Sequence, residues 1–202
     1  MTRRRLLAVV LALPLLLGAC GLTEDDGPNA IAPENLPPDL LDPNPGTSTT
    51  VADAPGSDLV SVWFLEEVRG EVRLVEVQRS VQDRADPGDR LVALFQQPTE
   101  EEAAGGIVTS IPADTTLRAM PVLDEETSEL VLDLSSEFLS IEGPEVPKAF
   151  AQIVWSVTDL DGVRRVRFLV DGEEIPALDA VGAEQPGPVS RANYTALAPA
   201  RT

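Results

Sequence analysis

Apolar residues in this chain recur with the spacing of secondary structure only from Asp58 onward, and this boundary limits what can fold. The preceding segment, Gly21 to Ser57, is rich in Pro, Asp, Glu and small polar residues and has no Trp, Phe or Tyr. Such a segment cannot bury enough apolar surface to offset the entropy lost on ordering, so we predict a disordered tether. The length that remains suffices for one hydrophobic core and not for two.

The first residues have the three parts of a secretory signal. Arginines at positions 3–5 precede an apolar run from Leu6 to Leu17, and the small residues Gly18 and Ala19 follow. A run of about 12 apolar residues is too short to span a bilayer as a helix, which takes about 20. We therefore predict a cleaved signal peptide over residues 1–19.

The only cysteine, Cys20, follows this signal directly. The sequence Leu17-Gly18-Ala19-Cys20 resembles the bacterial lipobox, in which the Cys thiol takes a diacylglycerol and the chain is cut before it. The resemblance implies an acylated Cys20, typically with palmitate, and a protein held by a lipid anchor on the outer, extracytoplasmic face of the cell membrane. Two or more acyl chains give stable anchoring. An ordinary secretory signal with an unused Cys near the cut is the alternative.

The charge balance restricts the partners. The chain has 34 acidic against 15 basic residues, a formal net charge of −19, and removal of the signal peptide takes away three basic residues and no acidic one. A surface this acidic repels nucleic acid and anionic lipid. We therefore predict contact with the lipid bilayer through Cys20 and no nucleic-acid partner. All basic residues except Lys148 are Arg, a composition typical of GC-rich genomes and suggestive of an actinobacterial type.

Strand and helix periodicities alternate after Asp58. The first strand is apolar on both faces, which is typical of a central strand, and Pro121 marks a later one as an edge. The expected order is strands at 59–67 and 73–81, a helix at 86–96, a capped helical turn at 99–105, strands at 116–123 and 129–138, a helix at 146–160 and a strand at 164–172. This order predicts an α+β fold: a single compact domain with a mixed or antiparallel sheet of about five strands and two main helices packed on one face.

The same segments carry a family resemblance. The order "VWFLEE", "LVEVQRSV", "QQPTEEEAAGGIVTSIP", "VLDLSSEF", "AFAQIVWSVT", "VRRVRFLVDGEE" and "PVSRANY" resembles the sporulation and spore germination domain, or GerMN domain, over residues 58–194. The resemblance implies a compact domain similar to the ring-building modules of secretion and sporulation assemblies, with an envelope protein as partner and without established catalytic residues. Residues 195–202 are expected to form a disordered tail.

Residue types argue against several catalytic classes. The chain has no His and no Cys besides Cys20, which excludes Ser-His-Asp and Cys-His nucleophiles. We predict no metal and no cofactor, because Asp159 and Asp161 lack the further ligands of a calcium loop and better fit a turn that ends a helix. Acidic runs at 100–102 and 124–126 are expected to be solvated. A hydrolase with paired carboxylates remains the least favoured alternative.

Five residues are candidates for function. Arg165 and Arg167 point outward from the last predicted strand and form a basic cluster that could meet an acidic partner. Trp63, with Ser135 and Ser136, could contribute to a ligand site, although core packing and a turn are the commoner uses of such residues. The preferred function is a non-catalytic interaction or assembly module of the cell envelope, related to sporulation or to the cell wall. The alternative is a ligand-binding module for cell-wall glycan or lipid.

Overall fold

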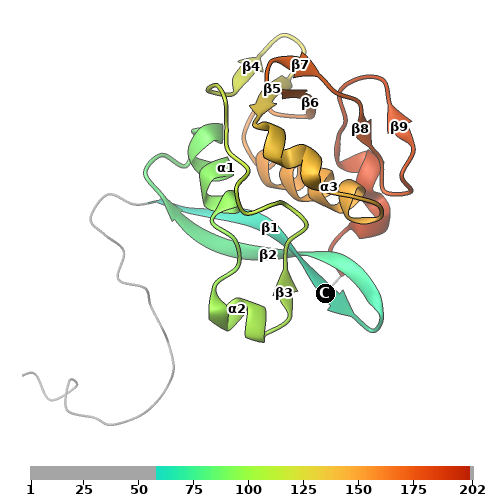
Figure 1. The fold of residues 1–202 in the computed structure, drawn as a ribbon. Coiled ribbons are helices and arrows are strands. Elements are labelled where there is room, and N and C mark those ends of the chain that lie inside the picture. Colours follow the sequence, from blue (N-terminus) through green and yellow to red (C-terminus); the bar gives the residue numbers. More distant parts are fainter. Residues whose placement is uncertain (1–57, 201–202) are drawn as a thin grey trace, which may run out of the picture. The chain divides into compact units, whose positions relative to one another are not determined.

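The computed structural model describes residues 58–200 (Figure 1). The predicted signal peptide, Cys20 and the predicted tether lie outside the described residues. In chain order the elements are β1 (Asp58–Val68), β2 (Glu71–Val81), α1 (Pro87–Phe95), α2 (Glu100–Ala104), β3 (Ile107–Val108), β4 (Val122–Asp124), β5 (Glu129–Leu134), the 3-10 helix η3 (Ser136–Ser140), α3 (Glu145–Val157), β6 (Arg165–Val170), β7 (Glu173–Glu174), β8 (Ala177–Leu178), β9 (Glu184–Gln185) and the 3-10 helix η4 (Arg191–Leu197).

The first sheet is built on a long hairpin. β1 and β2 pair antiparallel along their full length, and Arg69 and Gly70 close the turn with φ angles of 56° and 82°. Positive φ at both central residues gives the twist that a two-residue hairpin needs. β3 pairs with the other side of β1, so the order is β2-β1-β3. β1 is therefore the central strand that its two apolar faces predict.

The second sheet has the order β4-β5-β6-β7. β4 and β5 form an antiparallel hairpin, whereas β5 and β6 pair in parallel, joined by η3 and α3. The strand expected at 116–123 is reduced to Val122–Asp124, and Leu117 contributes one isolated bridge to Leu134. Pro121 has no N–H to donate, which fits the start of β4 directly after it.

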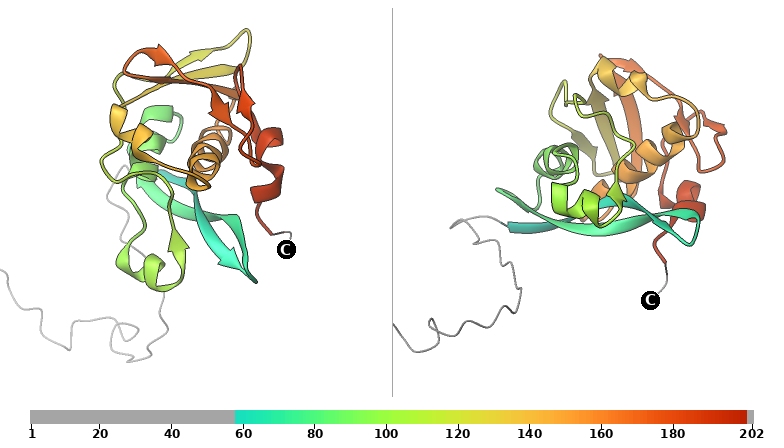
Figure 2. Two further views of the ribbon diagram at one scale, coloured as in Figure 1. Left: turned by 45° about the vertical axis from the view of Figure 1, so that its right-hand side comes forward. Right: turned by 60° about the horizontal axis from the view of Figure 1, so that its bottom comes forward.

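The two main helices lie between the two sheets (Figure 2). In α3, Phe150 packs edge-to-face on Phe168 of β6 at 4.8 Å, and Ser156 accepts a hydrogen bond from the backbone of Trp63 in β1. The α+β class is confirmed, with two main helices packed on one face of a sheet. The strands, however, are divided between two main sheets and a small β8-β9 pair and do not form one sheet of about five.

Local sequence chemistry sets the helix starts. The Asp86 side chain accepts from Gly88 N at 2.7 Å at the start of α1. Thr99 and Glu102 form the predicted capping box at the start of α2, which has no buried residue. The stability of α2 therefore depends on the hydrogen bonds that cap its ends and on the contacts of Glu102.

Polar side chains complete the ladder of β1 where β3 ends. β3 pairs with β1 only at Leu65 and Glu66. At Trp63 the backbone N–H donates to Ser156 Oγ at 2.9 Å, and the carbonyl accepts from Gln152 Nε2 at 3.2 Å. Arg90 Nη1 donates to the Ser61 carbonyl at 3.0 Å. Arg90, Gln152 and Ser156 are all buried, so these side chains take the place of a neighbouring strand.

The C-terminal segment corrects one expectation. The predicted disordered tail at 195–202 begins inside η4, which extends to Leu197. Leu197 is buried beside the fully buried Tyr194, and this apolar packing holds residues 195–197 to the domain. Residues 201–202 lie outside the described part. Between residues 58 and 200, no helix has the length and apolar character to cross a bilayer.

Candidate interaction surface

The side of the second sheet that points away from α3 is the most extended candidate surface. Along β5 and β6, residues alternate strictly: Leu130, Leu132 and Phe168 are buried against the helices, and the residues between them point to the other side. The cross-strand register places nine residues on that side. This outer sheet face consists of Val122, Asp124, Glu129, Val131, Asp133, Arg165, Arg167, Leu169 and Glu174.

Arg167 lies at the centre of the outer sheet face and is already engaged. Its Nε donates to Glu129 Oε1 at 2.6 Å, and Nη1 donates to Glu174. These bonds, first to Glu129 and then to Glu174, raise the pKa of Arg167 above its ordinary value. The Glu129 side chain is only 12% exposed, so this pair belongs to the structure of the sheet.

Arg165 is the available cation of the outer sheet face. It is exposed, its Nη2 donates to the Thr127 carbonyl at 3.0 Å, and no acidic residue within 58–200 forms an ion pair with it. Val122, 63% exposed, lies opposite the partly exposed Val131. The face thus combines a guanidinium that has no carboxylate partner within 58–200 with exposed and partly exposed apolar side chains. The structure separates the roles of the two arginines that the sequence grouped together.

The two tryptophans come together in the interior. Trp63 and Trp155 meet edge-to-face at 5.2 Å, and Trp63 is only 8% exposed. The Trp63 Nε1–H donates to Asp159 Oδ2 at 2.8 Å. Arg191 covers the other ring, with its guanidinium carbon 4.5 Å from the Trp155 ring centroid. A stacking platform needs an open ring face, so the arrangement fits core packing better than ligand contact.

Asp159 joins this cluster to the end of α3. Besides Trp63, its carboxylate accepts from Arg191 Nη2, and Arg90 Nη1 lies 3.9 Å away. Burial lowers the pKa of Arg90, an effect that the charge of Asp159 opposes. Cations at a helix C-terminus also interact favourably with the helix dipole. Asp159 lies in the turn after the C-cap Thr158 of α3, as the predicted helix-ending turn requires. No group of three or more potential metal ligands occurs in the described domain.

The two serines diverge. Ser135 is buried, and its hydroxyl accepts from Thr116 N at 3.0 Å, which ties the irregular segment before β4 to the end of β5. Ser136 is exposed and begins η3, and Phe138 folds back into the core with 2% exposure. This is the turn that the sequence favoured, and it leaves only Ser136 open to solvent.

Carboxyl groups with clear shifts all ionise more readily than usual. Hydrogen bonds from Arg79 lower the pKa of Glu102, and Lys148, followed by Ser110, lowers the pKa of Glu145. Hydrogen bonds from Thr127 and from Ser135 do the same at two exposed positions, Asp124 and Glu137. A general acid needs the opposite shift. These four carboxylates therefore act as hydrogen-bond acceptors.

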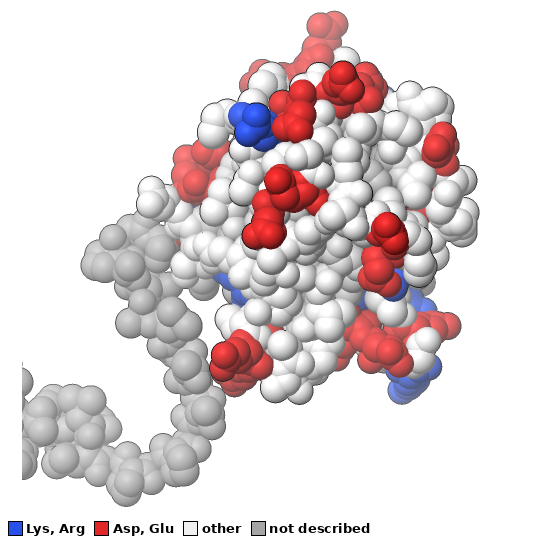
Figure 3. Space-filling model, viewed as in Figure 1, with Lys and Arg blue, Asp and Glu red and all other residues white. Residues whose placement is uncertain are grey.

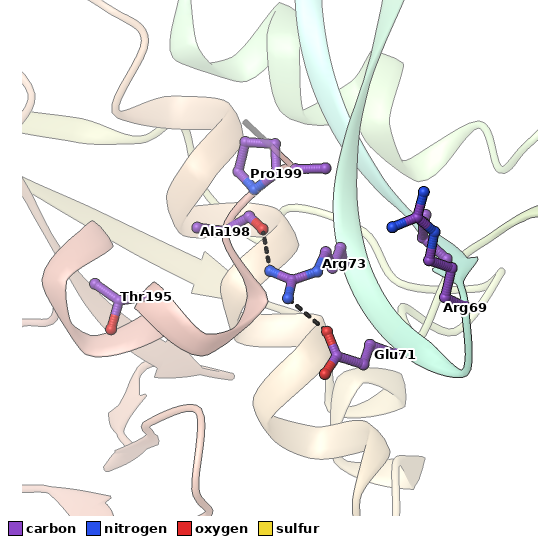
Figure 4. Close-up of a pocket in the computed structure, with 8 residues that line it drawn as sticks. Arg69, Glu71, Arg73, Thr195, Ala198 and Pro199 are labelled. Carbon is purple, nitrogen blue, oxygen red and sulfur yellow. Dashed lines mark hydrogen bonds and ion pairs between the residues drawn. The ribbon is translucent and has the colours of Figure 1, made fainter. Parts of the chain in front are cut away.

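Two shallow hollows open on the domain. The larger, about 490 Å³, lies between the tip of the β1-β2 hairpin and residues 195–200. Figure 4 shows the guanidinium of Arg73 directed to the Ala198 carbonyl and to the carboxylate of Glu71, at 3.4 and 2.5 Å. Arg73 and Glu71 in this hollow are thus already paired with each other. The smaller hollow, about 350 Å³, lies beside the first turn of α3.

Sequence patterns gave no functional indication for several of these residues. Arg90, Gln152, Ser156 and Arg191 carry the polar network around Trp63 and Asp159, yet none of them was a candidate, although three lie within segments that carry the family resemblance. For Gln152 and Ser156 a signal existed: they lie among the apolar residues of α3, most of which are buried. A polar residue enclosed on a helix of this kind needs a hydrogen-bond partner.

Comparison with known proteins identifies a matching family and similar solved structures. The family model Germane, described as sporulation and spore germination, matches residues 61–176. Among solved structures, the tandem GerMN domains of the sporulation protein GerM from Bacillus subtilis align at 20% identity with a TM-score of 0.55, over 73% of this chain and 49% of that one. The first GerMN domain of the same protein aligns at 16% identity with a TM-score of 0.49, over 67% of this chain and 98% of that one.

The matches differ in sequence identity and in the share of each chain that they cover. At 20% identity the tandem structure shows a shared fold, and this chain spans about half of its length. No curated protein matches the chain. The family model, by contrast, covers more than half of the chain and runs from within β1 to the segment after β7. The chain is a member of the Germane, or GerMN, domain family of sporulation and spore germination.

Proposed function

We propose that this protein is a lipid-anchored extracytoplasmic protein whose GerMN domain acts as a non-catalytic interaction or assembly module in the cell envelope. The outer sheet face carries this proposal. It presents the exposed Arg165 on β6 and the exposed Val122 on β4 to the same side of the sheet, and α1 and α3 lie on the opposite side (Figure 2). Exposed apolar residues beside charged ones are typical of protein contact surfaces.

The anchor is proposed from the sequence. Cys20 follows a complete signal pattern, and acylation of its thiol would hold the chain at the outer face of the membrane. The family description supports a role in sporulation or germination as the setting. The partner would be another envelope protein with an acidic and apolar surface that complements Arg165 and Val122.

The two other functions have less support. A glycan or lipid site at the tryptophans would need an open ring, and Trp63 is buried against Trp155 and Asp159. A paired-carboxylate hydrolase would need one carboxyl with a raised pKa, whereas the clear shifts at Glu102 and Glu145 are downward.

Site-specific photo-crosslinking in intact envelopes tests the interaction surface. A photoreactive residue at Val122, on the outer sheet face, is compared with one at Val92, which is similarly exposed on α1. We expect a discrete crosslinked protein from Val122 and none from Val92, and Arg165→Glu should weaken the Val122 product. Equal patterns at both positions would reject the outer sheet face.

The anchor has its own test. Cys20→Ala should release the protein from the membrane fraction while the domain stays folded, because the substitution lies far from the core in the sequence. Retention in the membrane fraction after a high-salt wash would reject the acylated Cys20.

Figure 3 shows the electrostatic setting of such contacts: acidic residues dominate the visible face of the domain and basic ones are few. An approaching partner with an acidic patch is therefore repelled except near the exposed arginines. The position of Arg165 would therefore help to determine how such a partner is oriented on the domain.

A further inference from the structure

The smaller hollow is built from three segments that lie far apart in the sequence. The first turn of α3 contributes Pro144, Pro147 and Lys148, the β8-β9 hairpin contributes Leu178 and Val181, and η4 contributes Leu197. Apart from Lys148, all of these side chains are apolar. A volume of about 350 Å³ is at the lower end of the range for ligand pockets, which suits a single inserted side chain better than a whole small molecule.

Val181 forms an apolar rim to this hollow and is 84% exposed. Its position is fixed by Asp179, whose Oδ1 accepts from Val181 N and from Ala183 N, both at 3.0 Å. The other carboxylate oxygen accepts from Gln185 Nε2 at 2.9 Å. These three hydrogen bonds order the turn between β8 and β9. The turn holds the apolar side chain of Val181 in contact with water. A partner side chain in the hollow would remove this apolar area from solvent.

Lys148 is the one charged residue that lines the hollow. Glu145, its ion-pair partner, does not line the hollow, so the lining charge is positive although the chain has 34 acidic and 15 basic residues. The ammonium group binds Glu145 Oε1 at 2.6 Å, and its remaining N–H groups can donate to a second acceptor. The charge therefore favours a carboxylate close to the apolar contact.

We propose that this hollow binds a segment of a partner protein in which an apolar side chain, such as Leu, is followed by Asp or Glu. The apolar side chain lies between Val181, Leu178 and Leu197, and the carboxylate pairs with Lys148. The proposal rests on the function proposed above in taking the domain as an interaction module, and it adds a second contact region with a defined partner chemistry.

The test is an NMR titration of the full chain with the blocked dipeptide Ac-Leu-Asp-NH₂. We expect shifts in the amide signals of Glu145, Val146 and Lys148 and of residues 178–182. The dipeptide Ac-Leu-Asn-NH₂, which lacks the charge, should bind about threefold more weakly, in line with an exposed ion pair. Val181→Ser should weaken binding of Ac-Leu-Asp-NH₂ about tenfold, since one Val side chain loses its apolar contact.

Matched variants keep the test specific. Val108→Ser changes a residue that is 52% exposed on β3, away from the hollow, and should leave the affinity unchanged. Lys148→Met retains the apolar stem and should abolish the preference for the Asp dipeptide over the Asn dipeptide. Equal weakening by Val181→Ser and Val108→Ser would overturn the proposal. Tighter binding of decanoate than of the dipeptide would also overturn it, in favour of a lipid ligand.

The two proposals fail separately. Arg165→Glu lies on the outer sheet face and should leave the titration unchanged. A failed titration together with intact crosslinks from Val122 rejects the hollow alone. Lost crosslinks together with an intact titration reject the outer sheet face alone.

Discussion

Arg79 holds Glu102 through two parallel hydrogen bonds of 2.6 Å each, and this pair ties α2 to the β1-β2 hairpin. The guanidinium carbon of Arg79 lies 5.2 Å from the ring centroid of Phe64, so the cation is enclosed between a ring and a carboxylate. The side chains of Arg79 and Glu102 are 12% and 20% exposed. A paired geometry with this little exposure is stronger than an ordinary surface ion pair.

Glu102→Gln should therefore destabilise the domain by about 1 kcal/mol, since the charge is lost while the shape is kept. Thermal unfolding of the full chain measures this. Glu101→Gln, an exposed neighbour on the same helical turn, is the control and should leave the melting temperature unchanged.

The effect of Glu102→Gln should depend on pH. Because the pKa of Glu102 is lowered in the folded state, its contribution is fully present above the ordinary Glu pKa of about 4.3 and is lost as the pH falls through the lower folded-state value. The difference in melting temperature between wild type and variant should be largest near neutral pH and shrink below about pH 4. A difference that stays constant down to pH 3 would contradict the assignment.

Gln152→Met should cost roughly 2 to 4 kcal/mol in the free energy of unfolding, although the volume changes little. The substitution leaves the Trp63 carbonyl and the Ser110 N–H without their partners in a buried site. Chemical denaturation measures the loss. A cost below 0.5 kcal/mol would mean that water replaces the lost bonds.

Phe150→Ala should cost about 3 to 5 kcal/mol, because its ring packs edge-to-face on both Phe138 and Phe168. Leu139→Ala, at a position that is 58% exposed beside Phe138, should change stability by less than about 0.5 kcal/mol. Chemical denaturation of both variants compares the loss of a buried apolar side chain with the loss of an exposed one. Similar losses would show that Leu139 of η3 also contributes to the core.

Arg165→Glu and Arg167→Glu should differ in stability. The first removes an exposed guanidinium and should leave the melting temperature nearly unchanged. The second places a carboxylate between Glu129 and Glu174 and should lower the melting temperature by several degrees. Equal melting temperatures would show that the ion pairs of Arg167 contribute nothing measurable, as is common for exposed pairs.

Sequence patterns predicted the local features well because local chemistry determines them. The capping box of Thr99 and Glu102, the N-cap at Asp86 and the turn at Gly70 all depend on residues within a few positions. The alternation in β5 and β6 likewise predicted Leu130 and Phe168 as buried, since one face of each strand packs on the helices.

The division into two sheets could not be read from these patterns. Strand pairing joins residues that are far apart, and periodicity gives a face without naming a neighbour. Arg191, which binds Asp159 from 32 positions away, gave no local signal at all. The outcome for Arg167 is similar: alternation placed it outward, but only the register of β5, β6 and β7 brings Glu129 and Glu174 to its guanidinium.

The side chains that complete the ladder of β1 also protect the protein from aggregation. Residues 60–65, VSVWFL, are an uncharged run of β-branched, aromatic and aliphatic residues without Pro or Gly, the kind of segment that forms intermolecular strand pairs when its edge is open. One edge is occupied by β2, and on the other Ser156, Gln152 and Arg90 hold the backbone groups of Trp63 and Ser61. A foreign strand would have to displace all three side chains at once. Variants at Gln152 or Ser156 should therefore accumulate in the insoluble fraction to a greater extent than their loss of folding free energy alone would produce.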